Sequence, residues 1–296
     1  MSLIQFLSYL INGISLGSVY AIIALGYTMV YGIAKMLNFA HGDIIMMGGY
    51  IAFCSLQYWG LNAWQAILLS MAACTAIGVV IERLAYKPLR QASSLAVLIT
   101  AIGMSYLLQN IALLIWGSSP KNFPSIMKLG SLRLFDGALQ IPINTLVTVG
   151  VSVLIMVGLN LFTGRTKLGK AMRVVSEDKG AAELMGIHVN RTISLTFAIG
   201  SALAAVAGVL LVSAYPILQP TTGSMPGIKA FTAAVFGGIG SIPGAMLGGI
   251  LLGVIEILGK AYVSTELGDA FVFAVLIIVL LFKPSGLLGK QTQEKG

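Results

Sequence analysis

The sequence predicts an all-α, polytopic membrane protein, and three observations support this fold class. Of the 296 residues, 57% are hydrophobic and 9% are charged, and the mean hydropathy is +0.93. A soluble domain carries roughly a quarter of charged residues. Several stretches, among them 95–116, 141–162 and 192–218, contain no charge and are long enough to cross a bilayer as helices. They are also continuously apolar, without the alternation of a membrane β-barrel.

We predict eight or nine membrane segments within one transmembrane domain that spans residues 1–296. The segments lie at about 4–30, 40–58, 63–82, 95–116, 141–162, 192–214, 228–239, 244–262 and 269–283. The stretch 228–239 is too short to cross a full bilayer upright, which favours a broken or re-entrant helix. The total is therefore eight or nine.

Basic residues between the spans predict the orientation of the chain. They gather at Arg83, Lys87 and Arg90, in the loop 163–191, and in the tail at Lys283, Lys290 and Lys295. Because cytoplasmic loops carry the excess of Lys and Arg, these regions are expected inside. The N-terminus is then expected outside, in the periplasm, the C-terminus in the cytoplasm, and 117–140 becomes the main external loop.

Two glycine- and proline-interrupted apolar regions, 37–53 and 223–253, resemble each other in physical character. Such paired breaks are typical of an inverted-repeat transporter with its pathway near the repeat interface. The alternative is that small residues merely allow close helix packing. We expect Asp43 to cap the helix that follows it, and Ser224 and Ser241 to cap two further helices whose N–H groups can meet a passing carboxylate. The candidate pathway-lining residues are Asn38, Gly42, Asp43, Ser224, Gly227, Gly237 and Gly238.

The loop 163–191 holds nine of the 28 charged residues and a short amphipathic helix. Ser176 is expected to cap this helix, Glu177 and Asp178 to occupy its first turn, and Gly186 to end it after about ten residues. Such a helix does not hold its shape alone in water, so it is expected to dock. The alternative is that its apolar face packs on the protein's own loops or at the lipid interface. The outward small and apolar residues are Ala181, Ala182, Leu184 and Met185.

Ionisable residues near membrane depth bear on ion coupling. We interpret Glu82 as half of an interfacial pair with Arg83, and Glu256 with Lys260 as a helix salt bridge. Lys229 is expected to extend its amine toward the external surface. None of these groups is expected at mid-membrane, which argues against an ion-coupled carrier.

Other functional classes find little support. The chain lacks nucleotide-binding, hydrolase and metalloprotease motifs, so it is predicted to be no enzyme and to hold no metal or cofactor. Cys54 and Cys74 lie in apolar spans and indicate no disulfide framework. The net charge of +8 is explained by orientation in the membrane and predicts no nucleic-acid partner.

Four segments carry a resemblance to a known family over nearly the whole chain. They read NGISLGSVYAIIALGYTMVYGIAKMLNFAHGDIIMMGGY, IERLAYKPLR followed by LAVLITAIGMSYLLQN, KLGKAMRVVSEDKGAAELMGI, and KAFTAAVFGGIGSIPGAMLGG. The chain resembles the LivH-type permease subunit of bacterial branched-chain amino-acid ABC importers.

The resemblance implies an importer of the bacterial inner membrane that works by alternating access. A second, LivM-like permease subunit, two LivG/LivF-like ATPase subunits, which use the ATP, and a periplasmic substrate-binding protein would be its partners. The helix from Glu177 to Gly186 would be its ATPase-coupling helix. Permeases for other amino acids, urea or short amides are alternatives, as is an ion-coupled secondary transporter.

Overall fold

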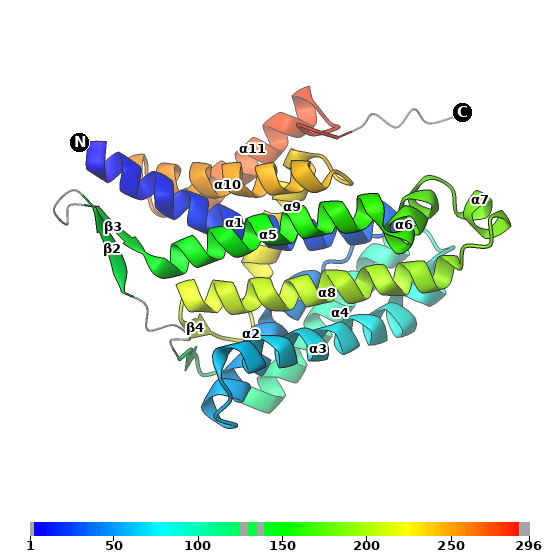
Figure 1. Cartoon of the computed structure of the whole chain (residues 1–296), viewed down its shortest axis with the longest axis horizontal. Helices are drawn as coiled ribbons and strands as arrows, with labels where there is room; N and C mark the ends of the chain where they lie inside the picture. Colours follow the sequence, from blue (N-terminus) through cyan, green and yellow to red (C-terminus); the bar gives the residue numbers. More distant parts are fainter. Residues whose placement is uncertain (1–2, 125–129, 135–138, 290–296) are drawn as a thin grey trace. The chain divides into compact units, whose positions relative to one another are not determined.

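The computed structural model describes residues 3–124, 130–134 and 139–289, and the chain divides into two compact units (Figure 1). Unit 1 comprises Met1–Thr28, Leu129–Val157 and Lys229–Gly296, and unit 2 comprises Met29–Lys128 and Gly158–Ile228. The all-α membrane class is confirmed, because the described chain is built almost wholly of helices. Part of the loop 117–140 and the tail residues Lys290 and Lys295 lie outside the described residues.

Six helical spans among the described residues are long and apolar enough to cross a membrane. They are Leu3–Ala34, Ala63–Leu89, Ser94–Trp116, Ile143–Arg165, Val189–Ala214 and Ile242–Tyr262. Every other predicted segment also contains a helix, but a shorter one: α2 (His41–Gln57), α9 (Ser224–Gly237) and α11 (Gly268–Phe282). The number of crossings, eight or nine, therefore stays a prediction, as does the inverted repeat.

Unit 2 is organised around three helices, α2, α3 (Ala63–Ile81) and α8 (Val189–Ala214), which pack against one another (Figure 1). Small residues bring their backbones into contact. A Cβ atom added at Gly208 would lie 2.2 Å from the Ile45 carbonyl oxygen, and one at Gly48 would lie 2.8 Å from the Ala205 Cα. This is the close packing that small residues allow between membrane helices.

The helix α4 (Ser94–Trp116) also contacts α2. Between α3 and α4 the chain forms a single π-helical turn, η1 (Glu82–Tyr86), and a 3-10 turn, η2 (Lys87–Leu89). A short antiparallel pair joins β1 (Lys121–Asn122) to β4 (Ile217–Leu218).

Unit 1 contains the first part of α1 (Leu3–Ala34), the first part of α5 (Ile143–Arg165), the end of α9, α10 (Ile242–Tyr262) and α11. Glycines again set the spacing, since a Cβ atom at Gly17 would lie 2.6 Å from the Ile250 carbonyl oxygen. Ser241 caps α10 by accepting a hydrogen bond from the Gly244 backbone, as predicted. The strands β2 (Ser131–Leu134) and β3 (Leu139–Pro142) pair antiparallel.

Candidate functional site

The charged loop 163–191 folds into two helices, α6 (Lys167–Glu177) and α7 (Lys179–Leu184). Asp178 separates them and caps α7, because its carboxylate accepts a hydrogen bond from the Ala181 N–H at 3.0 Å. The prediction that Ser176 caps a ten-residue helix was wrong. Ser176 lies in the last turn of α6, where its hydroxyl donates to the Arg173 carbonyl, and Glu177 ends that helix.

Gly186 ends α7 as predicted. Its φ angle is +78°, a left-handed conformation that glycine adopts without steric cost. The Ile187 N–H donates back to the Ala182 carbonyl at 2.9 Å, which closes the final turn. The α7 helix is therefore a short, sharply bounded knob between α6 and α8.

The exposed surface of α7 is concentrated at its C-terminal end. Leu184 is 92% exposed and Met185 is 63% exposed. The prediction that Ala182 faces water was wrong, because Ala182 is fully buried, and Ala181 is half-buried. Beside the knob, residues 186–191 and Glu183 line an open hollow of about 420 Å³. Two adjacent large apolar side chains left in water beside this hollow make it a candidate contact surface for another protein.

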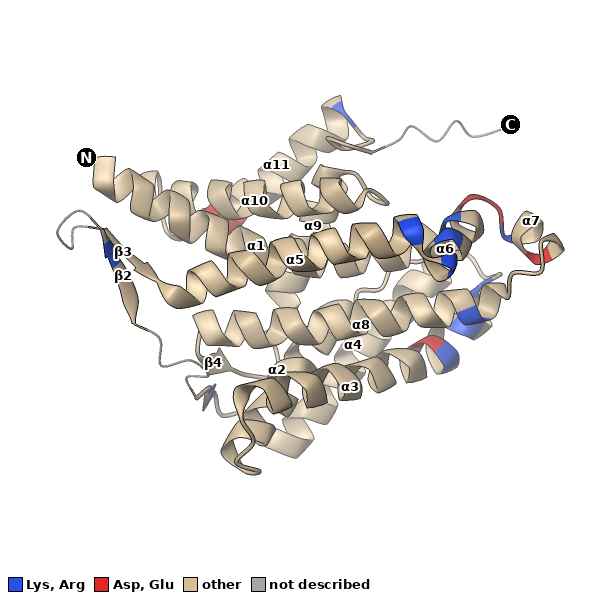
Figure 2. Ribbon diagram, in the orientation of Figure 1, with Lys and Arg blue, Asp and Glu red and all other residues tan. Residues whose placement is uncertain are grey.

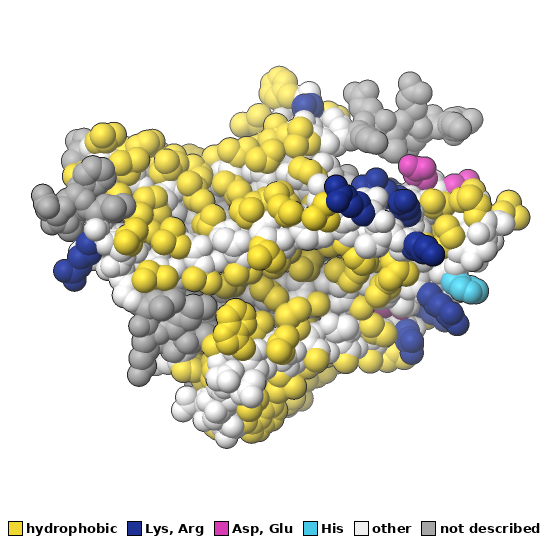
Figure 3. Space-filling model, viewed as in Figure 1, with side chains coloured by type: hydrophobic (Ala, Val, Ile, Leu, Met, Phe, Trp, Pro, Cys, Tyr) yellow, Lys and Arg dark blue, Asp and Glu magenta, His cyan; other side chains and the backbone are white. Residues whose placement is uncertain are grey.

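Basic residues surround this knob. Figure 2 shows the Lys and Arg of α6, the start of α8 and the end of α3 at one end of unit 2, whereas the shafts of these helices carry almost no charge. The space-filling view shows the same division, with hydrophobic side chains covering the shafts (Figure 3). Such a distribution is typical of the cytoplasmic end of a membrane protein.

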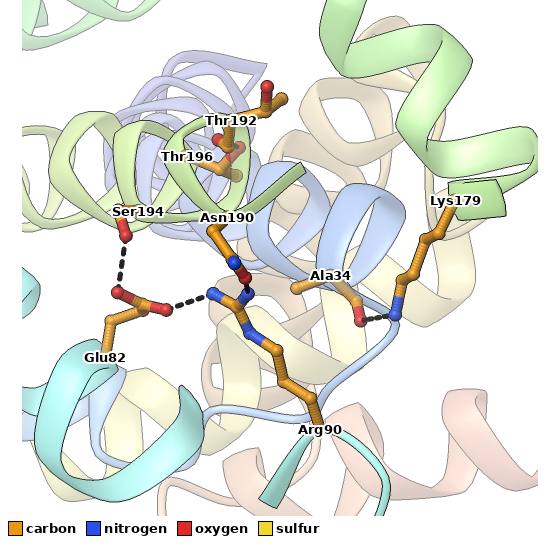
Figure 4. A network of polar contacts seen from close by, with 8 residues as sticks. All are labelled: Ala34, Glu82, Arg90, Lys179, Asn190, Thr192, Ser194 and Thr196. Carbon is orange, nitrogen blue, oxygen red and sulfur yellow. Dashed lines mark hydrogen bonds and ion pairs between the residues drawn. The ribbon is translucent and has the colours of Figure 1, made fainter. Parts of the chain in front are cut away.

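A polar network joins the helices at this end of unit 2 (Figure 4). The Glu82 carboxylate is fully buried, forms an ion pair with Arg90, and accepts a hydrogen bond from the Ser194 hydroxyl at 2.6 Å. Arg90 also donates to the Asn190 side-chain oxygen. The expected partner of Glu82 was Arg83, which is instead exposed. The pair of Glu82 with Arg83 was predicted because the two residues are adjacent in sequence. The observed partner, Arg90, follows the π-helical turn η1 and the 3-10 turn η2.

Four of the candidate pathway residues meet where α2 and α9 begin. Gly42 and Gly223 touch through their backbones, since a Cβ atom at Gly42 would lie 2.6 Å from the Gly223 carbonyl oxygen and 3.4 Å from the Gly227 Cα. The Gln109 amide, on α4, donates to the Asp43 carboxylate at 2.9 Å and to the Ser224 hydroxyl at 3.3 Å. The contact joins residues 66 and 115 positions apart, so no local pattern could have identified Gln109.

Asp43 does not cap α2, contrary to expectation. The N-cap position is Ala40, which makes no side-chain cap, and Asp43 lies in the first turn. A carboxylate there still faces the positive end of the helix dipole. Ser224 is the first residue of α9.

The other candidate pathway residues have packing partners within their own units. Asn38 is buried and accepts a hydrogen bond from the Tyr86 hydroxyl at 2.9 Å. Gly237 and Gly238 belong to unit 1, where they lie against the backbones of Gly244 and Gly289.

Unit 1 holds a cluster of four charges that sequence reasoning recognised only in part. Glu256 is 1% exposed and its Oε1 accepts from Lys229 at 2.8 Å and from Lys260 at 2.5 Å. Lys229 also pairs with Asp269 at 2.5 Å, and the Tyr20 hydroxyl donates to Glu256. The Glu256–Lys260 bridge was predicted, but the surface-seeking role of Lys229 was wrong. The expectation that none of these groups lies at mid-membrane stays a prediction, and within the cluster the two cations and two carboxylates compensate each other.

The fold and these sites define a multi-pass helical membrane protein with an exposed apolar knob at its basic end. Over residues 9–280 the sequence matches the family described as "Branched-chain amino acid transport system / permease component". The chain belongs to this family.

Curated relatives include the high-affinity branched-chain amino acid transport system permease protein BraD of Pseudomonas aeruginosa, which is 46% identical over 98% of each chain. The corresponding protein LivH of Escherichia coli K12 is 45% identical over 99% of this chain and 98% of its own. The ribose import permease protein RbsC of Escherichia coli K12 is 25% identical over 83% of this chain and 76% of its own. These relatives are transport permeases rather than enzymes.

One similar solved structure is that of PsaBC from Streptococcus pneumoniae in complex with Fab. It matches with a TM-score of 0.51 and 15% identity, over 95% of this chain and 96% of that one. At this identity the likeness concerns the fold alone.

Proposed function

We propose that this protein is the transmembrane permease subunit of an ATP-binding-cassette importer that moves branched-chain amino acids across the bacterial inner membrane by alternating access. The observation that carries the proposal is the α7 knob, which presents Leu184 and Met185 to solvent at the basic end of unit 2. The chain itself holds this six-residue helix through the Asp178 cap and the buried Ala182, yet it leaves the two large apolar side chains in water. An ATPase subunit that covers this surface would explain both the exposure and the position.

The family supports the same conclusion for the substrate. Relatives at about 45% identity over the whole length are named for branched-chain amino acids. In unit 2, the near absence of charge along α3 and α8 between their ends also suits an aliphatic side chain (Figure 2). The ribose permease relative favours a second candidate, a permease for a different small solute, at its lower identity.

The proposed assembly contains a second, LivM-like permease subunit, two LivG/LivF-like ATPase subunits and a periplasmic substrate-binding protein. ATP is bound by the ATPase subunits, and this chain is proposed to hold no cofactor of its own. The basic end with α6 and α7 faces the cytoplasm, so the N-terminus lies in the periplasm and the C-terminus in the cytoplasm. The loop 117–140 receives the binding protein.

In the ATPase contact, Leu184 and Met185 supply the apolar area. Glu183 flanks them and Gly186 fixes the turn. The remaining predicted coupling residues support the position of α7 and do not supply its exposed apolar surface. Asp178 caps α7, Ala181 and Ala182 lie on its more buried side, and Glu177 ends α6.

For the pathway, we place the amino-acid head group at the start of α2. Asp43 is 1% exposed and takes part in none of the ion pairs found among the described residues, unlike the buried carboxylates Glu82 and Glu256. A buried carboxylate without a cation favours the approach of one. The substrate ammonium group would fill that role, with Gln109 and Ser224 as neighbouring hydrogen-bonding groups, beside the place where Gly42 packs against Gly223 and Gly227. Pathway roles for Asn38, Gly237 and Gly238 stay predictions of the sequence pattern.

Reconstitution tests the proposal. The chain is inserted into proteoliposomes with the second permease subunit, the ATPases and the binding protein, and radiolabelled leucine uptake is measured with and without ATP. Uptake is expected only with ATP and binding protein, and competition by valine and isoleucine but not by urea or ribose. Uptake by this chain alone without ATP would overturn the proposal, and uptake driven by a proton or sodium gradient would favour an ion-coupled carrier.

A further inference from the structure

The polar network at the basic end of unit 2 joins the α7 knob region to the helical core through side chains that no motif assigns. Glu82 follows α3 directly, Arg90 follows η2, and Asn190 and Ser194 lie one turn apart at the start of α8. The Glu82 carboxylate and the Arg90 guanidinium therefore tie the ends of three segments together (Figure 4).

The distance along the chain from the knob to this network is short. Only residues 185–188 separate α7 from α8, and Asn190 is the second residue of α8. A displacement of the C-terminal end of α7 would act on Asn190 through this short link. From there the contact with Arg90 leads directly to the buried carboxylate.

A second tie leaves the opposite end of α7. The Lys179 amine donates to the carbonyl oxygen of Ala34, the last residue of α1, at 3.4 Å (Figure 4). A cation at a helix C-terminus stabilises the unpaired carbonyl groups there. Partial burial, together with the positive charges of Arg90 and Lys35, lowers the pKa of Lys179. Lys179 therefore gives α7 a second attachment, to the end of α1.

We propose that Glu82, Arg90, Asn190 and Ser194 form a polar clamp that transmits movement of the α7 knob to α3 and α8. The proposal rests on the proposed function, in which an ATPase docks on α7. The four side chains are positioning residues: they hold the ends of the helices together so that the helices follow the knob. The clamp suits this role because its carboxylate is fully buried, and a buried carboxylate separated from its cation is costly.

The obvious variant, Arg90→Met, is unsuitable as the main test, because it would leave Glu82 charged and buried and could prevent folding. Asn190→Ala and Ser194→Ala each remove one hydrogen bond and leave the ion pair in place. Thr192→Ala is the matched control. It removes a hydroxyl from the same turn, but this hydroxyl donates at 3.1 Å to the His188 carbonyl within its own helix and does not enter the clamp.

The experiment uses the complete importer in proteoliposomes and measures three quantities for each variant. These are the affinity for the ATPase subunits, the rate of ATP hydrolysis, and the leucine taken up per ATP hydrolysed. Because one hydrogen bond shifts a conformational equilibrium by about fivefold, uptake per ATP is expected to fall by about that factor in Asn190→Ala and Ser194→Ala. ATPase affinity is expected to stay native, the thermal midpoint to fall only slightly because one hydrogen bond is lost, and Thr192→Ala to keep the native ratio.

The clamp is refuted if both variants keep the native uptake per ATP, or if Thr192→Ala lowers that ratio equally. A lower thermal midpoint with an unchanged ratio would assign the network a purely structural role and would also reject the proposal. Failure of the proposed function looks different, because the native complex itself would then show no ATP-dependent uptake.

Discussion

Truncation of Leu184 tests whether the α7 knob is a docking surface. In the isolated chain its side chain is 92% exposed, so Leu184→Ala removes almost no internal packing. The thermal stability of the permease should therefore be unchanged. If an ATPase subunit buries this side chain, the substitution removes apolar burial worth about 2 kcal/mol. Since each 1.4 kcal/mol is about a tenfold change in affinity, ATPase binding should weaken about 30-fold.

The assay places the permease in nanodiscs with a native second permease subunit and titrates purified ATPase subunits by interferometry. Leu168→Ala is the control, since Leu168 lies on the neighbouring α6, is 55% exposed, and loses the same atoms. Leu184→Asp should be more severe than Leu184→Ala, because docking would also desolvate a charge. Native affinity in Leu184→Ala, or an equal loss in Leu168→Ala, would refute the assignment of α7 as the contact.

Two further predictions concern packing and charge. Gly208→Ala should destabilise unit 2 by about 1–3 kcal/mol in a thermal unfolding assay, because its Cβ would lie 2.2 Å from the Ile45 carbonyl oxygen. Gly103→Ala is the control and should cause no such loss, because nothing lies within 4 Å of a Cβ atom there. Glu256→Gln should lower the free energy of unfolding by about 3 kcal/mol, because among the described residues Asp269 is then the one carboxylate left to pair with the buried amine of Lys229. A native unfolding midpoint would show that the ion cluster is not needed for stability.

The helices were predictable because membrane burial leaves a strong mark on composition. Long uncharged runs such as 95–116 must satisfy their backbone groups internally, so length and apolarity identify them. The C-cap at Gly186 was equally accessible, since glycine is the usual residue for a left-handed helix end.

The start of α7 was not predictable in the same way. Ser176 and Asp178 are both good N-cap residues, two positions apart, and local preference does not choose between them. The structure extends α6 through Glu177, so that Asp178 becomes the cap. Burial of Ala182 is likewise a tertiary effect, invisible in a short polar segment.

Long-range polar pairs were the main omission. Lys229 contacts Glu256 and Gln109 contacts Asp43, at separations of 27 and 66 residues. Asp43 alone is interpreted as a capping residue and Lys229 as an interfacial one, Glu256 is paired only with Lys260, and no local pattern singles out Gln109. Only the packing of distant helices determines which cation meets which carboxylate, and a single sequence contains no record of that pairing.

The packing of unit 2 provides a physical route from the proposed clamp to the carboxylate of Asp43. The backbones of α2, α3 and α8 touch at glycines such as Gly48 and Gly208, with few side-chain atoms between them to absorb a displacement. Close-packed interiors transmit strain because they compress little. If the proposed clamp moves α8, this packing would carry the movement to α2, and Asp43 lies in the first turn of that helix. The contact of Asp43 with Gln109 on α4 is where such movement would alter access to the proposed ammonium site.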